Sequence, residues 1–292
     1  MKTKRLQRTT LVGRDFSVKE LRLIKQIVEL YPGLSRTELS QTICENISWQ
    51  APNGTNKHNS CLRALEKLEA QGHIKLPSLR PTKGKRNVGV NITQRTDPDE
   101  LIQGRIDQWG EVRINKVSRE QLSLWNEYVQ RYHYLGYKIP FGLHLRYFIV
   151  SGERVLGCML YTASAWALEC RDKWIGWTYK QKERNLYRII NQSRFLILPW
   201  IQIKNLASHV LSLSIKKIGE DWQERFGYKP VLIETFVDPE KYKGVCYQAS
   251  NWTHIGKTKG RGRQDRHSKG LSTIKDIYVY ILDANFREEL AR

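Results

Sequence analysis

The chain has 292 residues, with 49 Lys and Arg against 29 Asp and Glu, so its formal net charge is +20 and its pI is near 9.8. This excess of cations predicts a polyanionic partner, DNA by default, while no apolar run reaches the roughly 20 residues that would indicate a membrane partner. Five cysteines without a CxxC pair argue against a disulfide framework and a four-Cys zinc site, and favour a cytoplasmic protein.

Residues 16–92 have the pattern of a winged helix-turn-helix. Capping boxes at 17–20 and 35–38 begin two helices, a third begins near Asn59, and a strand and a basic hairpin at 81–92 follow. The third helix would enter the major groove and the hairpin would rest on the backbone, although a helical protein-protein module is the alternative. The residues expected to bind DNA are Lys57, His58, Asn59, Arg63, Lys83, Lys85 and Arg86.

Two polar segments flank this region. Residues 1–15 are rich in basic side chains and predict an arm that lies on phosphate, although a solvated tail would look the same. Residues 93–104 are polar, contain Pro98 and predict a linker. Residues 105–292 then form a second, mixed α/β domain, which makes the fold class of the whole chain α/β (α+β).

The first half of that domain predicts a strand at 112–117, a helix from Ser118 and an antiparallel hairpin formed by 146–150 and 155–161. A further helix is expected at 183–191. The helix from Ser118 ends in Tyr132-His133-Tyr134, too many adjacent rings for one buried face, so we expect some of them to be exposed near a ligand. The aromatic segment 166–177 predicts a lid, a nucleotide-stacking surface or simply core.

The second half is organised around a βαβ unit. An apolar strand at 194–198, a helix at 203–226 and a β-rich strand at 230–237 predict two parallel neighbours joined by a crossover. A helix is expected at 241–252 and a strand at 277–282. Because exposed backbone amides and side chains converge where parallel strands end, we expect the functional site at this edge.

Two carboxylates lie at that edge. Glu234 and Asp238 are four residues apart across the end of a strand, and a turn at Asp238-Pro239 would let both approach one point. Beside many cations they predict a Mg²⁺ or Mn²⁺ site for phosphodiester cleavage. The alternative is that they pair with the abundant Arg and Lys side chains.

Three other side chains are candidates for chemistry. Cys246 and Tyr247 would lie near a helix N-terminus among cations, which favours a thiolate or phenolate nucleophile, although free cysteines are often buried. His133 is a candidate acid or base, with a structural histidine as the alternative. No Walker loop, GxGxxG fingerprint or Ser-His-Asp spacing is present, so P-loop hydrolysis is not expected.

A basic loop spans residues 256–275. Residues 257–275 contain seven Lys and Arg against one Asp, and the interspersed glycines allow backbone amides to approach phosphate. The strand predicted at 277–282 fixes its second end, so the loop predicts a grip on a nucleic-acid backbone. This loop and the strand predicted at 194–198 give a second set of expected DNA-binding residues: Arg194, Lys257, Arg261, Arg263 and Arg266.

Six segments of the chain carry a family resemblance. They are YHYLGY (132–137), SRFLILPW (193–200), NLASHVLS (205–212), PVLIETFVD (230–238), GVCYQASNW (244–252) and GKTKGRGR (256–263). Together they closely resemble the DruA family, which is named for the Druantia anti-phage system and also occurs with transposable elements. The resemblance implies a role in DNA transactions of antiviral defence or transposition.

The order of elements after residue 105 also resembles the GNAT acetyltransferase fold. In that fold the turn before the long helix binds the pyrophosphate of coenzyme A through a glycine-containing signature. The corresponding turn here is Gln202-Ile-Lys-Asn205-Leu-Ala207, with Asn205 in place of the first glycine. A Cβ and an amide there would crowd the phosphate, so coenzyme A is not expected as a cofactor.

These observations support three functional hypotheses. The first is a DNA-binding and DNA-processing protein of nuclease or transposase type that nicks or transfers strands in a mobile element or defence system. The second is a non-catalytic DNA-binding adaptor that recruits a partner nuclease, helicase or transposase. The third is a GNAT-fold acyltransferase.

Overall fold

The computed structural model describes residues 7–31, 34–52, 55–78, 89–138, 140, 143–260 and 273–292. The chain divides into two compact units, the first formed mainly by residues 1–87 and the second by residues 88–224 and 229–292. Each unit has its own sheet and helices, and each is considered by itself.

The first unit contains a short hairpin and three helices. Its elements are β1 (Thr9–Leu11), β2 (Arg14–Phe16), α1 (Val18–Leu30), α2 (Arg36–Asn46) and α3 (His58–Ala70). Ser17 and Ser35 cap α1 and α2 in complete capping boxes, as the sequence predicts. The three helices enclose an apolar core in which Leu39, Ile43 and Leu65 are completely buried.

Two expectations for this unit need correction. Residues 9–16 form the β1–β2 hairpin, with Phe16 in the core, so this part of the predicted arm is folded. Residues 73–78 and 89–92 form no strand, because they have no ladder partner among the described residues. The predicted wing residues 81–86 lie outside the described residues.

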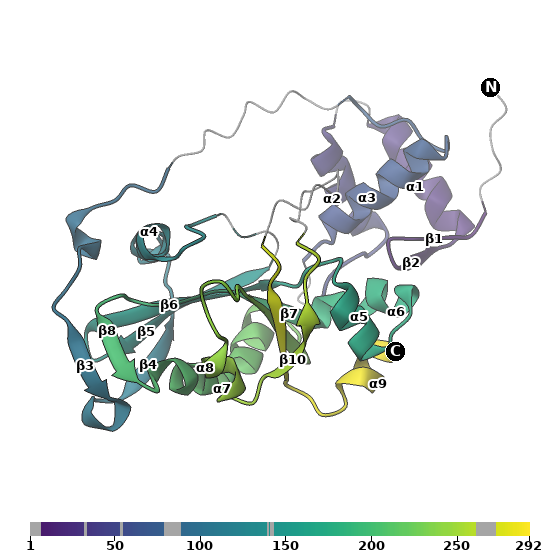
Figure 1. Cartoon of the computed structure of the whole chain (residues 1–292). Helices are drawn as coiled ribbons and strands as arrows, with labels where there is room; N and C mark the ends of the chain where they lie inside the picture. Colours follow the sequence, from purple (N-terminus) through teal and green to yellow (C-terminus); the bar gives the residue numbers. More distant parts are fainter. Residues whose placement is uncertain are drawn as a thin grey trace. The chain divides into compact units, whose positions relative to one another are not determined.

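A seven-stranded mixed sheet forms the centre of the second unit (Figure 1). Its strands, in spatial order, are β10 (Thr253–Lys257), β11 (Asp276–Ile281), β9 (Leu232–Val237), β7 (Ile189–Ile197), β6 (Arg154–Ala163), β5 (His144–Ser151) and β4 (Val112–Lys116). Within it β7 and β9 are parallel, and all other neighbours are antiparallel. The predicted parallel pair and the predicted β5–β6 hairpin are therefore confirmed. A separate parallel pair is formed by β3 (Ile102–Arg105) and β8 (Ile201–Lys204).

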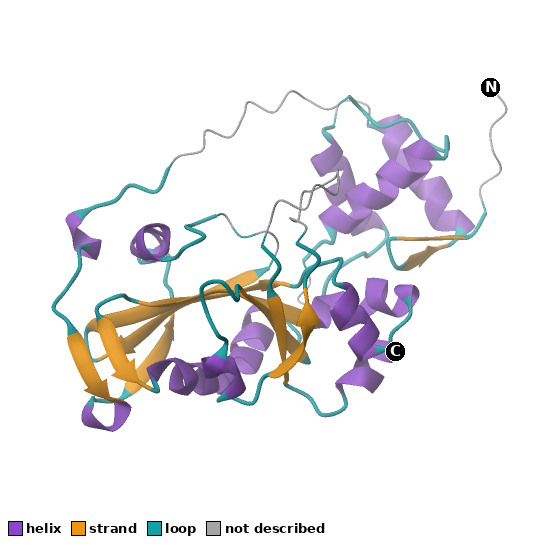
Figure 2. Ribbon diagram, viewed as in Figure 1, coloured by secondary structure: helices purple, strands orange, loops and turns teal. Residues whose placement is uncertain are grey.

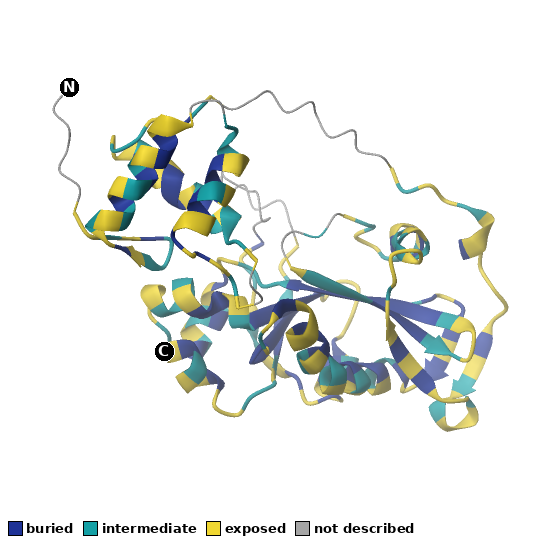
Figure 3. Cartoon of the chain, turned by 180° about the vertical axis from the view of Figure 1, so that it is seen from behind, coloured by how far each residue is buried: buried dark blue, intermediate teal, exposed yellow. Residues whose placement is uncertain are grey.

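Helices cover both faces of the sheet, with α4 and α7 on opposite sides (Figure 2). The α-helices are α4 (Leu122–Tyr132), α5 (Glu169–Ile175), α6 (Tyr179–Asn185), α7 (Leu206–Phe226), α8 (Val245–Gln248) and α9 (Phe286–Ala291), and the 3₁₀ helices are η1 (Gln94–Thr96), η2 (Ile106–Gln108) and η3 (Leu186–Arg188). Figure 3 shows that the middle of the sheet is buried and the outer sides of the helices are exposed. None of the helices in the described ranges combines the length and apolarity needed to cross a bilayer.

Buried polar contacts fix these helices on the sheet. The Trp125 indole of α4 donates to the carbonyl of Tyr147 (3.0 Å) on β5. On the other face, the Tyr147 hydroxyl donates to Asp221 (2.9 Å) of α7. Tyr161 and Ser214 form a further buried hydrogen bond of 2.8 Å between β6 and α7. A buried polar group needs a hydrogen-bond partner at a particular position. These hydrogen bonds therefore fix the register of α4 and α7 on the sheet as well as their packing.

Two predicted helices of the second unit are shorter than expected. Residues 183–191 contain the end of α6 and the 3₁₀ helix η3, because β7 begins at Ile189. Residues 241–252 contain only α8, because Gly244 caps it in a left-handed conformation (φ 69°). A Cβ at Gly244 would lie 2.6 Å from the Tyr278 hydroxyl, so glycine is required there on two grounds.

The segment predicted as a linker packs on the second unit. The Thr93 and Thr96 hydroxyls donate to the Glu127 carboxylate of α4, at 2.9 and 2.8 Å, and Thr96 is completely buried. Residues 102–105 follow as β3, paired with β8. Residues 93–105 are therefore fixed to this unit by hydrogen bonds.

Candidate nucleic-acid interface

The two central parallel strands separate towards their carboxyl ends. Pairing joins residues 189–192 of β7 to residues 232–235 of β9 and then stops, although β7 continues to Ile197 and β9 to Val237. The chain turns immediately after β9, where the Lys241 and Tyr242 amides donate to the Asp238 carbonyl (3.1 and 2.9 Å). This edge is where the sequence predicts a functional site.

Seven side chains gather at this edge, and we call them the tyrosine–cation cluster. They are His133 and Tyr134 after α4, Arg194 of β7, Asp238, Lys241 and Tyr242 after β9, and Lys275 before β11. Tyr134 stacks on His133 (centroids 5.0 Å apart) and lies 5.8 Å from the Tyr242 ring. Lys241 and Lys275 each place Nζ 5.7 Å from the centre of the Tyr134 ring.

The cluster has more positive charge than its one carboxylate neutralises. Among the described residues, Arg194 donates to the carbonyls of Gly136 (3.2 Å) and Ser193 (2.7 Å). Burial lowers the pKa of both Arg194 and Lys275, and Asp238 partly opposes this for Lys275. Within the described part of the chain, Arg194, Lys241 and Lys275 form no ion pair. Like charges crowded in this way favour the binding of an anion.

His133 is held neutral by burial and by the same cations. Burial, and then the charges of Arg194 and Lys275, lower the pKa of His133 to about 3. The Leu135 amide donates to its Nδ1 (3.2 Å), which requires that nitrogen to be unprotonated. His133 is thus a hydrogen-bond acceptor and a ring for stacking, and its neutral form persists at neutral pH.

We expect His133→Gln to reduce the loss of stability in acid. The unfolded chain takes up a proton on His133 below about pH 6.5 and the folded chain only near pH 3, so the wild type loses stability as pH falls between these values. Between pH 7 and 5 the wild type should lose about 2 kcal/mol more than the variant. Urea unfolding of both proteins at both pH values measures this difference, and equal losses would contradict it.

Asp238 is buried at the base of the turn. Its oxygens accept from the Glu240 amide and from the Thr273 hydroxyl, each at 3.2 Å. Thr273 belongs to the second end of the basic loop, so Asp238 links the end of β9 to that loop. The side chain therefore positions the cluster, whatever further role it has.

Glu234 lies on the same strand but in a different environment. Its two oxygens accept from the Ala165 amide and from Arg171 Nη1, both at 2.8 Å, and both Glu234 and Arg171 are completely buried. Glu234 thus forms a buried ion pair with Arg171, which is the alternative to a metal site shared with Asp238. Among the described residues no group of three His, Cys, Asp or Glu side chains has the geometry of a metal site. The metal hypothesis stays a prediction, and the geometry favours the ion-pair alternative.

Cys246 and Tyr247 lie in the short helix α8. Burial raises the pKa of the Cys246 thiol and, far more strongly, that of the Tyr247 hydroxyl, so both are neutral at neutral pH. The Tyr247 hydroxyl donates to Gln192 (2.9 Å), and its ring stacks on Tyr278. A nucleophilic role for either residue stays a prediction, but Tyr247 is a core side chain.

The expected DNA-binding residues are distributed over both units. On α3, Asn59 and Arg63 are exposed, whereas Lys57 and His58 are half-buried and burial lowers the pKa of Lys57. Lys257 is exposed and lies 4.0 Å from Asp276. Six further predicted residues lie outside the described residues: Lys83, Lys85, Arg86, Arg261, Arg263 and Arg266.

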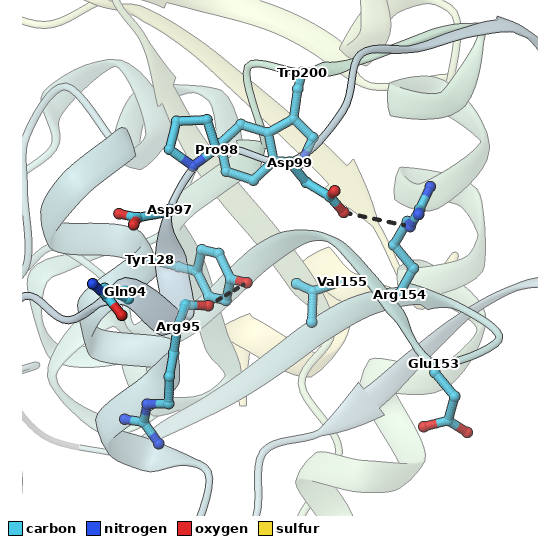
Figure 4. A pocket seen from close by; sticks show the side chains of 10 residues that line it. All are labelled: Gln94, Arg95, Asp97, Pro98, Asp99, Tyr128, Glu153, Arg154, Val155 and Trp200. Carbon is cyan, nitrogen blue, oxygen red and sulfur yellow. Dashed lines mark hydrogen bonds and ion pairs between the residues drawn. The ribbon is translucent and has the colours of Figure 1, made fainter.

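A pocket of about 510 Å³ opens elsewhere on the second unit (Figure 4). It is lined by Gln94, Arg95, Asp97, Pro98, Asp99, Tyr128, Glu153, Arg154, Val155 and Trp200. Its charges are largely satisfied within the protein, since Asp97 pairs with Arg131 (2.6 Å) and Asp99 with Arg154 (3.6 Å). In the tyrosine–cation cluster, by contrast, three cations form no ion pair with any residue that the structure describes.

The sequence profile described as "Druantia protein DruA" matches residues 67–283, which is most of the chain and includes the whole cluster. The chain belongs to the DruA family. No curated protein matches this DruA-family chain.

Solved structures similar to this DruA-family chain include several acetyltransferases. Aminoglycoside acetyltransferase AAC(6')-Ib, solved with coenzyme A and kanamycin, is 11% identical, with 61% of this chain and 99% of that chain covered and a TM-score of 0.39. A mutant of the spermidine N-acetyltransferase SpeG from Vibrio cholerae is 11% identical, with 59% of this chain and 94% of that chain covered and a TM-score of 0.38. A GNAT-family acetyltransferase from Bacillus cereus is also 11% identical, with 59% of this chain and 98% of that chain covered and a TM-score of 0.34. Similarity at this level has no bearing on activity.

Part of the tyrosine–cation cluster of this DruA-family chain could not be predicted from the sequence. His133, Arg194 and Asp238 are predicted site residues, and Tyr134 belongs to the run of rings Tyr132-His133-Tyr134, some of which the sequence predicts to be exposed; it is 37% exposed. Lys241 and Tyr242 are missed because the expected helix at 241–252 assigns them no special position. The available signal is their place directly after the end of a parallel strand.

Proposed function

We propose that this DruA-family protein binds DNA as a component of antiviral defence or transposition, and processes it by strand nicking or transfer. The tyrosine–cation cluster and the basic loop 256–275 would hold the DNA backbone. The N-terminal helices, as a winged helix-turn-helix, would select the site. The family name supports the defence role, and the charge of the chain supports DNA as the ligand.

The observation that carries DNA binding is that the basic loop begins and ends at the cluster. The Thr258 amide donates to the Lys275 carbonyl (2.8 Å), and the Lys275 amide donates to the Thr258 hydroxyl (2.9 Å). Lys275 Nζ in turn lies 3.5 Å from the Tyr134 hydroxyl. The cations of the loop sequence and those of the cluster can therefore act on one stretch of phosphates.

The proposed recognition helix is α3. Asn59 and Arg63 are one turn apart and exposed, while Cys61, Ala64, Leu65 and Leu68 form the buried side of the helix. Asn and Arg are suited to bidentate contacts with adenine and guanine edges. This supports base contacts from α3.

Incubation of the full chain with labelled duplex and single-stranded DNA, with and without Mg²⁺ or Mn²⁺, tests both parts of the proposal. We expect binding that weakens steeply with added salt, together with a nicked product or a covalent adduct. Negligible affinity at low ionic strength would refute DNA binding. Binding without any product would refute strand processing alone.

A non-catalytic adaptor is the second candidate, and the state of three side chains at the edge supports it. Glu234 is committed to Arg171, and Cys246 and Tyr247 are neutral and largely buried. An adaptor would keep its DNA affinity and its activity in the complete system when Cys246 is changed to Ser and Glu234 to Gln. Loss of system activity with unchanged affinity would exclude it.

An acyltransferase is a further alternative. Asn205 adopts the left-handed conformation (φ 66°) that a glycine would take in the turn before α7, so the turn keeps its path while carrying a Cβ. Calorimetry with acetyl-CoA tests this alternative. Absence of heat at millimolar ligand would exclude it.

A further inference from the structure

Two tyrosines of the tyrosine–cation cluster are exposed although they lie beside the edge of a buried sheet. Tyr134 is 37% exposed and Tyr242 is 55% exposed. Both rings belong to turns, one after α4 and the other after β9, and they contact each other at an angle of 60°. Aromatic side chains that gather on a cationic surface in this way are available to a ligand with its own ring face.

The cluster supports the ring of Tyr134 from several sides. His133 stacks beneath it with an interplanar angle of 26°, and Lys241 and Lys275 flank it. Tyr242 contacts this fixed ring and is the more exposed of the two. Tyr242 therefore offers an accessible face, while Tyr134 and the lysines fix its surroundings.

We propose that the cluster binds a single-stranded or locally unpaired DNA segment, with a base stacked on Tyr242 and the neighbouring phosphates held by Lys241 and Lys275. This inference rests on the proposed DNA binding and specifies its substrate class. Within a duplex, both faces of each base are stacked on neighbours, so a protein ring can reach a base face only where the bases are unstacked. Phosphates alone would need the lysines but not the tyrosine.

The balance of charge and aromatic surface distinguishes this ligand from others. A free anion would be served by Arg194, Lys241 and Lys275 without an exposed ring. An apolar partner would not require three cations with a single carboxylate, Asp238, among them. A base joined to phosphates uses both features.

Tyr242→Leu and Tyr242→Phe separate stacking from general binding. We expect the Leu variant to lose about 5- to 100-fold in affinity for a 20-nucleotide single strand, and the Phe variant to stay within about twofold of the wild type. Duplex affinity should change less than about twofold in both. An oligonucleotide containing 2-aminopurine should be quenched on binding to the wild type and the Phe variant but not to the Leu variant.

Tyr179→Leu is the matched control, because Tyr179 is 63% exposed at the start of α6 and does not belong to the cluster. It should leave both affinities unchanged. Unaltered single-strand affinity and quenching in Tyr242→Leu would overturn the stacking inference while leaving the proposed function intact. A protein that binds neither single strand nor duplex would instead refute the proposed function. Tighter binding of RNA of the same sequence would overturn the assignment to DNA.

Discussion

Arg171→Met is expected to lower the free energy of unfolding by about 3–5 kcal/mol, the usual cost of removing one partner from a buried ion pair. Arg171 is completely buried and donates to Glu234 (2.8 Å), to Asp172 (2.7 Å) and to the Ala165 carbonyl (2.8 Å). The substitution would leave the Glu234 carboxylate completely buried without a cation. Of the partners that Glu234 has among the described residues, the Ala165 amide would remain.

Urea unfolding followed by circular dichroism measures this loss. Lys173→Met is the matched control on the same helix, because Lys173 is 77% exposed in its pair with Glu169 and an exposed ion pair contributes little to stability. The double variant Arg171→Met/Glu234→Met should recover much of the loss, since it buries no charge. A single variant as stable as the Lys173 control would contradict the prediction.

This result bears on how Glu234 is tested as a catalytic group. Glu234→Ala would leave the Arg171 guanidinium without its buried partner, so lost activity could reflect a lost fold. Glu234→Gln keeps an oxygen for the Ala165 amide and removes only the charge. Activity measurements on the Gln variant, with its unfolding curve alongside, therefore separate the two roles.

Lys241→Gln/Lys275→Gln is expected to weaken DNA binding by about 10- to 100-fold at low salt. Both lysines flank Tyr134 and neither forms an ion pair among the described residues, so each is available to a phosphate. Loss of two phosphate contacts should also reduce the slope of log affinity against log salt by about 2. Anisotropy titrations of a fluorescent oligonucleotide at several salt concentrations measure both quantities.

Lys180→Gln/Lys216→Gln is the control for the change in net charge. These two lysines are exposed on α6 and α7 and lie outside the cluster. The control should shift affinity only slightly, with an unchanged salt slope. Equal effects of the two double variants would mean that DNA responds to overall charge rather than to this surface.

The sequence predicts the elements whose patterns are local. The apolar runs on either side of the long helix 206–226 are enough to predict the parallel pair β7–β9, and both capping boxes predict helix starts. Prediction from local pattern fails at Gln192 of β7, because a polar residue in the sequence indicates a helix or a loop rather than the middle of a sheet. Its side chain is satisfied by Tyr161 and Tyr247, contacts that only the folded chain creates.

The sequence predicts where the candidate site lies but not which side chains form it. The end of β9 follows from the parallel pair, and Asp238 with it. The pairing of Glu234 with Arg171 spans 63 residues and depends on how α5 packs, so spacing along the chain could not reveal it. Lys241 and Tyr242 depend on a turn formed at the Asp238 carbonyl rather than on a helix.

The two hydrogen bonds between Thr258 and Lys275 have an evolutionary consequence. They join the two ends of the basic segment to each other beside β10 and β11, so the positions of these ends do not depend on the number of residues between them. The length or sequence of the segment can therefore change while the sheet and the tyrosines keep their places. Such a scaffold can change what it binds by altering one insert.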